Sequence, residues 1–190
     1  LGKNNISAVI GTEAKKENGE HLQGYGRGLV IEDLDYRYLD TVTEGKSVSN
    51  NASTYAMVSY FGKVNYAFDD KYLISGTVRR DASSRFGKGN NSAIFPSVSA
   101  GWRVSREKFM ECTQNWLSDL KLRASWGING NDQIDNNATY NLYYTNMSNG
   151  SYNFNGDGTT VLPGVQKDRS GNNDLKWEEA KQLNFGIDAA

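Results

Sequence analysis

Hydrophobic and polar side chains alternate along much of the chain with a period of two, most clearly between residues 54 and 130. In the segment YFGKVNYAF, for example, Val64 and Phe68 fall on one face, whereas Lys63 and Asn65 fall on the other. Successive side chains of a β-strand point to opposite faces of a sheet, so this period is typical of strands. The pattern predicts an all-β fold of antiparallel, up-and-down strands.

Six segments carry the alternation and predict strands at residues 4–13, 54–68, 71–85, 94–105, 118–130 and 175–189. Polar residues dominate 14–53 and 131–174, and these stretches are predicted to be long loops. Phe109, Cys112 and Trp116 recur at intervals of three or four, which predicts a short helical turn near 106–117. Short turns therefore alternate with longer loops, as in a transmembrane β-barrel whose long loops lie outside.

The two faces of the predicted strands differ in polarity. One face carries charged and amide side chains, and its candidate members are Lys63, Asn65, Arg79, Asp81, Arg103, Lys121 and Arg123. A Lys or Arg at the midplane of a bilayer costs about 2–4 kcal/mol, so in a barrel this face would line the lumen. Arg85, Arg79, Asp81 and Lys63 form the densest charge group, which we interpret as a ladder of cross-strand ion pairs.

Aromatic residues lie near the ends of the apolar stripes. Those near the short turns are Tyr66, Phe68, Tyr72 and Trp102, and those near the opposite ends are Trp126 and Trp177. Membrane barrels carry aromatic girdles at both interfaces, so this placement predicts two such girdles.

Composition narrows the possible functions. Only 37% of the residues are hydrophobic, mean hydropathy is -0.66, and no apolar run approaches the ~20 residues of a transmembrane helix. The net charge of -1 gives no reason to expect a nucleic-acid partner. Cys112 is the single cysteine and is expected to be buried or half-buried, and His21 has no second ligand at metal-binding spacing. We expect no catalytic site, no cofactor and no metal site.

The alternation has a second interpretation. A soluble or surface-attached all-β module for carbohydrate binding or adhesion would bury Tyr66, Trp102 and Trp126 in a core and leave the opposite face wet. The pattern of polarity alone leaves both interpretations open.

Four separated motifs favour the membrane interpretation, because their amino-acid sequences resemble those of one known family. The motifs are YFGKVNYAFDDKYLISGTVRRDASSRFGKGN, FPSVSAGWRVSREKFM, WLSDLKLRASWGINGNDQI and NNDLKWEEAKQLNFGID. In this order they resemble the C-terminal barrel half of the SusC/RagA family of TonB-linked outer-membrane transporters, over residues 54–134 and 172–188. Ala82 stands where the family motif more often has Gly.

The resemblance implies a fragment of a large barrel in the bacterial outer membrane. It implies import of nutrients, oligosaccharides or peptides, with a SusD-like surface lipoprotein that caps the barrel. It also implies a plug, absent from this sequence, on which TonB pulls to admit the ligand. The start LGKNNISAV does not read as a signal peptide, and a strand pattern still runs at Ala189, so we expect a piece of a longer chain.

The loop predicted at 131–174 carries the candidate ligand contacts. Aromatic residues alternate there with Asn and Ser, and they are Tyr140, Tyr143, Tyr144, Tyr152 and Phe154. Aromatic rings among amides suit stacking on sugars, although they also suit loops that pack on one another. The Asn- and Asp-rich stretch at 129–137 resembles a calcium loop in composition but lacks the spacing of an EF-hand, so a turn-rich loop is favoured.

Overall fold

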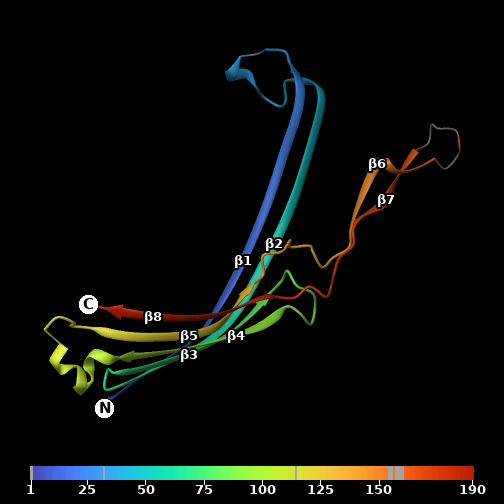
Figure 1. The fold of residues 1–190 in the computed structure, drawn as a ribbon. Coiled ribbons are helices and arrows are strands. Elements are labelled where there is room, and N and C mark those ends of the chain that lie inside the picture. Colours follow the sequence, from blue (N-terminus) through green and yellow to red (C-terminus); the bar gives the residue numbers. More distant parts are fainter. Residues whose placement is uncertain (1, 32, 114, 154–155, 157–160) are drawn as a thin grey trace. The chain divides into compact units, whose positions relative to one another are not determined.

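The computed structural model describes residues 2–31, 33–113, 115–153, 156 and 161–190, and antiparallel strands dominate it (Figure 1). The strands are β1 (Asn4–Leu29), β2 (Val42–Phe68), β3 (Tyr72–Ser83), β4 (Ser92–Arg103), β5 (Leu120–Asn131), β6 (Leu142–Asn153), β7 (Val161–Arg169) and β8 (Glu178–Ala189). Three short 3-10 helices are η1 (Leu34–Tyr36), η2 (Val104–Arg106) and η3 (Lys108–Thr113). Among the described residues no helix has the length and apolar character needed to cross a membrane. The predicted all-β antiparallel fold is confirmed.

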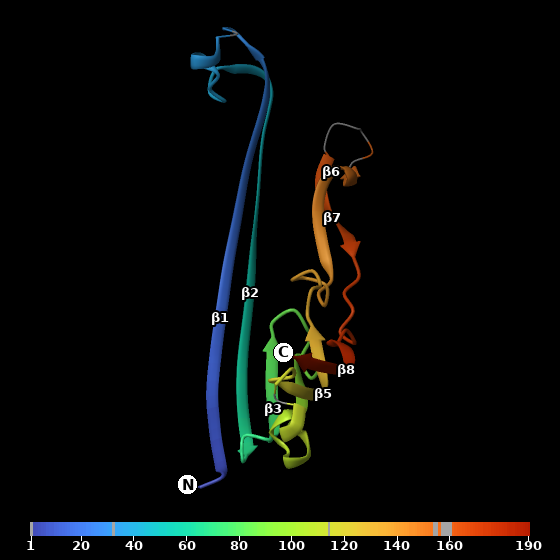
Figure 2. The ribbon, with the colours of Figure 1, turned by 60° about the vertical axis from the view of Figure 1, so that its left-hand side comes forward.

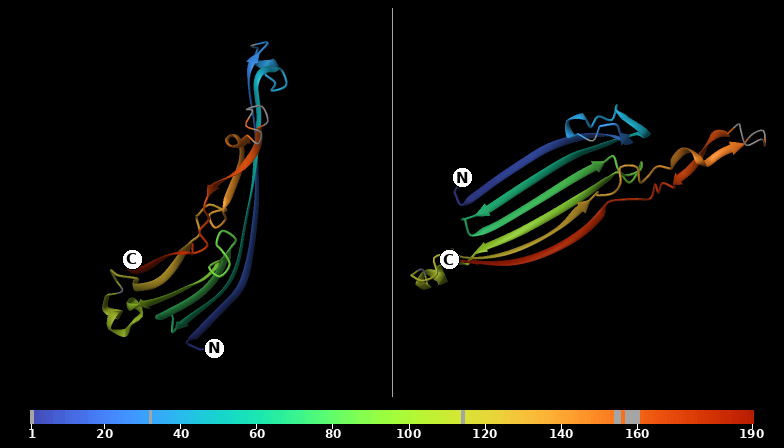
Figure 3. Two further views of the ribbon diagram at one scale, coloured as in Figure 1. Left: turned by 90° about the vertical axis from the view of Figure 1, so that its right-hand side faces the viewer. Right: turned by 90° about the horizontal axis from the view of Figure 1, so that it is seen from above.

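Six strands form one sheet in the order β1-β2-β3-β4-β5-β8, and β6 pairs with β7 in a separate hairpin (Figure 2). Figure 3 shows β3, β4, β5 and β8 side by side along a common curve. Each strand of the sheet pairs with the next strand along the chain, except that β8 joins β5 after the intervening hairpin. This up-and-down order is the one expected for a segment of barrel wall.

The predicted strands at 71–85, 94–105, 118–130 and 175–189 agree with β3, β4, β5 and β8 to within a few residues. The helical turn predicted near 106–117 takes the form of η2 and η3. Cys112 lies in η3 and is exposed, so its expected burial is wrong.

The loops predicted at 14–53 and 131–174 are wrong over much of their length. β1 continues to Leu29 and β2 begins at Val42, and the second stretch contains β6 and β7. Residues 42–56 of β2 come before the register with β3, which begins at Met57, so with the facing part of β1 they form a two-stranded ribbon. Nearly all of their side chains are exposed on both faces. A ribbon without a buried face needs no alternation of hydrophobic and polar side chains, so these strands could not be predicted from the sequence pattern.

Residues 16–55 form a compact unit of their own, at the tip of the β1–β2 hairpin. The Asp33 side chain caps η1 by accepting a hydrogen bond from the backbone N–H of Asp35 at 3.2 Å. Val42 is buried in this unit and lies against Gly26, where a larger residue would overlap it. Gly26 therefore permits the close approach of the two strands near the tip.

The sheet has two unlike faces, and cross-strand register defines them. In the register Tyr66 faces Ile74, Ile74 faces Ala100, and Tyr72 faces Trp102. We call this side the apolar face. Tyr66 is half-buried there. The large hydrophobic side chains of this face that are at least 36% exposed are Ile6, Ile10, Val58, Tyr60, Val64, Phe68, Tyr72, Ile74, Val78, Ile94, Val98, Trp102, Leu122, Trp126, Leu183, Phe185 and Ile187. No described part of the chain covers them as a second layer would. The core expected of a soluble module at Trp102 and Trp126 is therefore absent from the described residues.

The buried aromatic residues lie elsewhere, near the loops that join β3 to β4 and β5 to β8. Phe86, Phe95 and Trp177 are 5–8% exposed, and each of the two Phe rings lies 5.3 Å from the Trp177 ring. The Trp177 indole N–H also donates to the Asn91 carbonyl at 3.2 Å. We call these three rings the aromatic knot. Trp177 is thus buried, and its predicted place in an exposed aromatic girdle is wrong.

Candidate functional site

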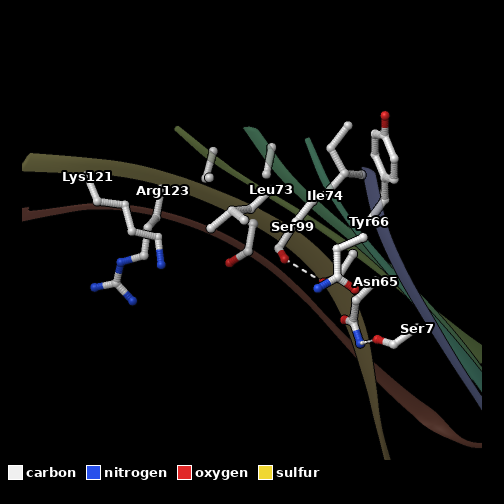
Figure 4. A pocket seen from close by; sticks show the side chains of 15 residues that line it. Ser7, Asn65, Tyr66, Leu73, Ile74, Ser99, Lys121 and Arg123 are labelled. Carbon is white, nitrogen blue, oxygen red and sulfur yellow. Dashed lines mark hydrogen bonds between the residues drawn. The ribbon is translucent and has the colours of Figure 1, made fainter. Parts of the chain in front are cut away.

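The seven polar residues predicted to share a face do so. Their positions alternate with the apolar face in every strand, and the register pairs Lys63 with Thr77, Asn65 with Ser75, and Lys121 with Arg103 and Asp188. We call this side the polar face. Figure 4 shows Lys121, Arg123 and Asn65 on one side of the strands, and Ile74 and Tyr66 on the other. Whether the polar face lines a lumen stays a prediction.

A shallow concavity of about 540 Å³ lies over the polar face. Asn5 and Ser7 of β1, Asn65 of β2, and Lys121 and Arg123 of β5 contribute to its lining (Figure 4). The concavity draws on strands from β1 to β5, so the polar face is the hollow side of the sheet.

Arg79 is the centre of the strongest charge cluster on the polar face. Its guanidinium lies 2.7 Å from the Asp81 carboxylate and 2.9 Å from that of Glu13, and it also donates to the Ser59 hydroxyl at 2.9 Å. The same guanidinium lies 5.7 Å from the centre of the Phe61 ring. Asp81 and Ser59 are buried, so the cluster ties β1, β2 and β3 together.

Arg85 does not join that cluster, although the sequence grouped it there. Its guanidinium donates to the Asn136 side chain at 2.8 Å and to the Asp132 carbonyl at 3.0 Å. The Ser83 hydroxyl donates to the Asp132 carboxylate at 2.8 Å. Arg85 lies beyond the end of β3, where the alternation of side chains between the two faces stops. Its position in the alternating pattern, odd or even, therefore no longer predicts the direction of its side chain.

A row of small neutral polar residues crosses the whole polar face. Each is the register partner of the next or bonds to it, and the members are Ser7, Asn65, Ser75, Ser99, Ser125 and Asn184. The Asn65 amide donates to the Ser7 hydroxyl at 3.1 Å, and the hydroxyls of Ser75 and Ser99 lie 2.7 Å apart. Hydroxyl and amide groups both donate and accept hydrogen bonds, so this hydroxyl row offers both functions to a polar solute.

Charged residues flank the hydroxyl row on the side of the short turns. Arg123 pairs with Asp188 at 2.8 Å across β5 and β8. The Arg103 Nε is buried and has no hydrogen-bond partner in the part of the chain that the structure describes. Lys121 is the register partner of Arg103 and lies two residues before Arg123 on the same face of β5. The polar face is therefore more basic toward the short turns than at the hydroxyl row.

The short turns are joined by a second polar network. The Glu107 carboxylate accepts hydrogen bonds from the Tyr72 hydroxyl at 2.7 Å and the Trp102 indole N–H at 3.1 Å, and it lies 3.5 Å from the Lys71 ammonium. These contacts, led by the Tyr72 hydroxyl and then Trp102, hold the pKa of Glu107 below its usual range. Asp69 has a lowered pKa mainly because the Lys3 ammonium bonds to it at 3.2 Å.

Among the predicted ligand-contact aromatics, those with described side chains do not all share one face. Tyr140 and Tyr143 are 61% and 60% exposed, whereas Tyr144 is half-buried. Tyr143 and Tyr144 are neighbours in β6 and so point to opposite faces of its hairpin. Phe154 and the side chain of Tyr152 lie outside the described residues. Ligand contact at this loop stays a prediction.

The Asn- and Asp-rich stretch at 129–137 uses its carboxylates for contacts within the protein. Asp135 accepts a hydrogen bond from the Asn137 backbone at 2.8 Å and pairs with Arg169 at 3.2 Å. The Asn137 bond, followed by the Arg169 contact, holds the pKa of Asp135 below its usual range. Within the described residues no cluster of three or more His, Cys, Asp or Glu side chains is placed to hold a metal ion.

Comparison with known proteins agrees with this geometry. The family model described as "TonB dependent receptor-like, beta-barrel" matches residues 4–189. The chain belongs to this family. TonB-dependent receptor SusC of Bacteroides thetaiotaomicron is 34% identical over 189 residues, which are 99% of this chain and 18% of that protein. TonB-dependent receptor P3 of Formosa agariphila is 34% identical over 194 residues, again 18% of its length.

Solved structures give the same result for this TonB-dependent receptor segment. A structure of the RagAB peptide transporter matches all of the chain with a TM-score of 0.83 and 32% identity, and the match covers 20% of that chain. The resemblance to the SusC/RagA family is confirmed, and the segment is part of a β-barrel of the bacterial outer membrane. The chain spans about a fifth of the length of these relatives. They are named as receptors or a transporter rather than as enzymes.

Several residues of this receptor segment were missing from the sequence prediction. Glu13 and Ser59 complete the Arg79 cluster, and Asp188 pairs with Arg123. Each lies at a position of polar parity, so parity could have placed it on the correct face. Their partners depend on strand register, which the pattern of a single strand does not contain.

Proposed function

We propose that this segment forms part of the wall of an outer-membrane transporter that imports a polar nutrient, with its polar face toward the lumen and its apolar face toward lipid. The observation that carries the proposal is the separation of most hydrophobic from most polar side chains between the two faces across six strands. Arg80, near the loop end of β3, is an exception on the apolar face. In a barrel of this kind, lipid-facing and lumen-facing residues alternate along every strand. Most exposed hydrophobic side chains of the sheet and the seven predicted polar residues follow that rule.

The length of the apolar face fits a bilayer. Its members in β2 run from Val58 to Phe68, which is ten residue steps. At ~3.4 Å per residue this is about 34 Å along the strand, and a tilt of ~40° reduces it to about 26 Å across the membrane. The apolar band of an outer-membrane barrel is ~25 Å tall, so the two heights are comparable.

Aromatic residues at one end of the band support the same orientation. Phe68 and Tyr72 stack with ring centres 6.4 Å apart, and Trp102 is the register partner of Tyr72. The Tyr72 and Trp102 polar atoms both reach Glu107, while their rings stay on the apolar face. Rings with one wet end and one apolar body are typical of a membrane interface.

The nutrient in this proposal is an oligosaccharide or a peptide, delivered by a SusD-like lipoprotein and admitted through the action of TonB. The hydroxyl row supplies neutral donors and acceptors, which suit sugar hydroxyls and peptide amides alike. The relatives point the same way, since one is named SusC and another belongs to a peptide transporter called RagAB. Uptake of labelled oligosaccharides and peptides by cells with and without the full-length receptor, and with and without TonB, distinguishes these substrates.

The orientation of the wall is tested by placing arginine on each face of the full-length receptor. Val64→Arg, Ile74→Arg and Leu122→Arg put a guanidinium on the apolar face, at a cost of about 2–4 kcal/mol near the midplane. We expect less receptor in purified outer membranes and weaker heat-modifiable mobility on gels. Lys63→Ala and Arg123→Ala change the polar face and leave assembly unchanged.

The opposite result would reject the proposal. If arginine at Ile74 is tolerated and Arg123→Ala prevents assembly, the apolar face does not contact lipid. The soluble binding or adhesion module makes a third prediction, because it would give these residues a monomeric, cooperatively melting fold without detergent. We expect aggregation instead, since the isolated sheet has two unpaired edges at β1 and β8.

A further inference from the structure

The turn that joins β4 to β5 carries two large apolar side chains with no described cover. Phe109 in η3 is 64% exposed, and Trp116, shortly after η3, is 75% exposed. Their neighbours Met110 and Leu117 are half-buried. The turn therefore buries part of its apolar surface against the protein and leaves the rest outside.

The structure also shows which side of the sheet this turn approaches. Glu107, two residues before Phe109, bonds to Tyr72 and Trp102, which are register partners on the apolar face. The side chain of Glu107 is 16% exposed, so the contact is close and enclosed. The start of the turn is thus held at the edge of the apolar face and not over the hollow polar face.

Backbone hydrogen bonds fix the described residues on both sides of the turn. The Met110 N–H donates to the Glu107 carbonyl at 2.9 Å, and the Leu117 N–H donates to the Thr113 carbonyl at 2.9 Å. At the base of the turn, the Ser105 hydroxyl donates to the Asp119 carboxylate at 3.0 Å. Phe109 and Trp116 therefore each lie next to hydrogen-bonded residues of the turn.

We propose that Phe109 and Trp116 form a lipid anchor, in which the β4–β5 turn inserts both rings into the headgroup region of the leaflet nearest the short turns. The argument for lipid as the occupant is continuity, because the turn is tied to aromatic residues that end the apolar face. Trp is favoured at this depth, since its ring is apolar while its N–H can reach water or headgroups. The inference rests on the proposed lipid contact of the apolar face and extends that contact beyond the strands.

Collision measurements on spin labels test the anchor in the full-length receptor, reconstituted in vesicles of phosphatidylethanolamine and phosphatidylglycerol. Nitroxides are attached at Phe109→Cys and Trp116→Cys, in a background without other accessible cysteines that includes Cys112→Ser. Oxygen concentrates in lipid, whereas a water-soluble nickel chelate does not enter it. We expect oxygen to relax both labels several-fold more strongly, relative to the nickel chelate, than it relaxes a label at Glu111→Cys.

Two outcomes would overturn the anchor. If the labels at 109 and 116 meet the nickel chelate as often as the label at Glu111→Cys, the rings lie in water. If they are shielded from both probes, protein covers them instead of lipid. A label at Ile74→Cys separates this failure from that of the proposed wall, because it reports lipid contact of the apolar face independently. Heat-modifiable mobility confirms that each labelled variant is folded.

Discussion

Removal of the Trp177 ring tests whether the aromatic knot holds the loops at its end of the sheet. Trp177 is 8% exposed, packs on Phe86 and Phe95, and donates its N–H to the Asn91 carbonyl. Truncation of a buried aromatic residue to Ala costs about 3–5 kcal/mol, which includes about 1 kcal/mol for such a hydrogen bond. Each 1.4 kcal/mol is a factor of ten, so Trp177→Ala should make opening of these loops roughly 10² to 10⁴ times more frequent.

Hydrogen exchange of the full-length receptor in detergent, followed by mass spectrometry, measures this opening directly. The reporter amides are those of Ser83, which donates to the Asn91 carbonyl at 2.9 Å, and Asn90, which donates to the Gly87 carbonyl at 3.1 Å. Both lie in the segment that the knot fixes. We expect their exchange to accelerate by the same factor in Trp177→Ala, while amides at the centre of β3 and β4 keep their protection.

Trp177→Phe is the matched control, because it keeps most of the ring contact and loses the N–H donor. Its effect should be about 1–2 kcal/mol, or about tenfold in exchange. The reasoning is refuted if Trp177→Ala accelerates exchange at Asn90 no more than Trp177→Phe does. Uniform acceleration across β3 and β4 would also refute it, since the knot would then stabilise the whole sheet.

Two further predictions concern the same end of the molecule. Gly171→Ala should destabilise the base of the β6–β7 hairpin, because an added Cβ would overlap backbone atoms of Thr139 and Tyr140. Gly76→Ala is the control and should be neutral, because a Cβ there meets open space. Heat-modifiable mobility on gels compares the stability of the two variants. The pKa of Asp135 is lowered, first by the hydrogen bond from the Asn137 backbone N–H and then by Arg169. The Asp135 carboxylate therefore stabilises the loop fully above about pH 4, the pKa of an unfolded Asp, and this stabilisation is lost as the pH falls through the pKa of Asp135 in the folded protein. Fluorescence of a dye on the β6–β7 hairpin should report that acid transition, and Arg169→Gln should shift it to higher pH; an unchanged midpoint would contradict the assigned cause.

The two faces of the sheet were predictable because the polarity of successive side chains alternates along the strands. Val64, Ile74 and Leu122 differ in polarity from their neighbours, and this contrast alone assigned them to one side. The hydroxyl row was only half predictable. Parity placed Ser125 and Asn184 on the polar face, but their pairing requires β8 to return to β5 across a separate hairpin.

The long β1–β2 ribbon could not be found from alternation. Apart from the buried Val42 and Tyr55, residues 16–29 and 42–55 expose nearly all of their side chains on both faces. Without a buried face the strands need no alternation, so the sequence resembles a loop. The prediction that Trp177 lies in an exposed aromatic girdle was wrong for a different reason. It lies within the predicted strand 175–189 but precedes the observed β8, and the group it bonds to lies 86 residues away in the sequence. Contacts of this kind depend on the register of several strands at once.

That dependence gives the aromatic knot a role in assembly. A slip of one residue in any hairpin turns hydrophobic side chains toward water and is strongly disfavoured. A slip of two residues keeps every face correct, so polarity does not oppose it. Such a slip moves a strand by about 7 Å, however, which exceeds the 5.3 Å ring separations of Trp177 from Phe86 and Phe95. The three rings can pack together only when β3, β4, β5 and β8 are all correctly aligned. The aromatic knot therefore disfavours the two-residue slips that polarity alone would permit.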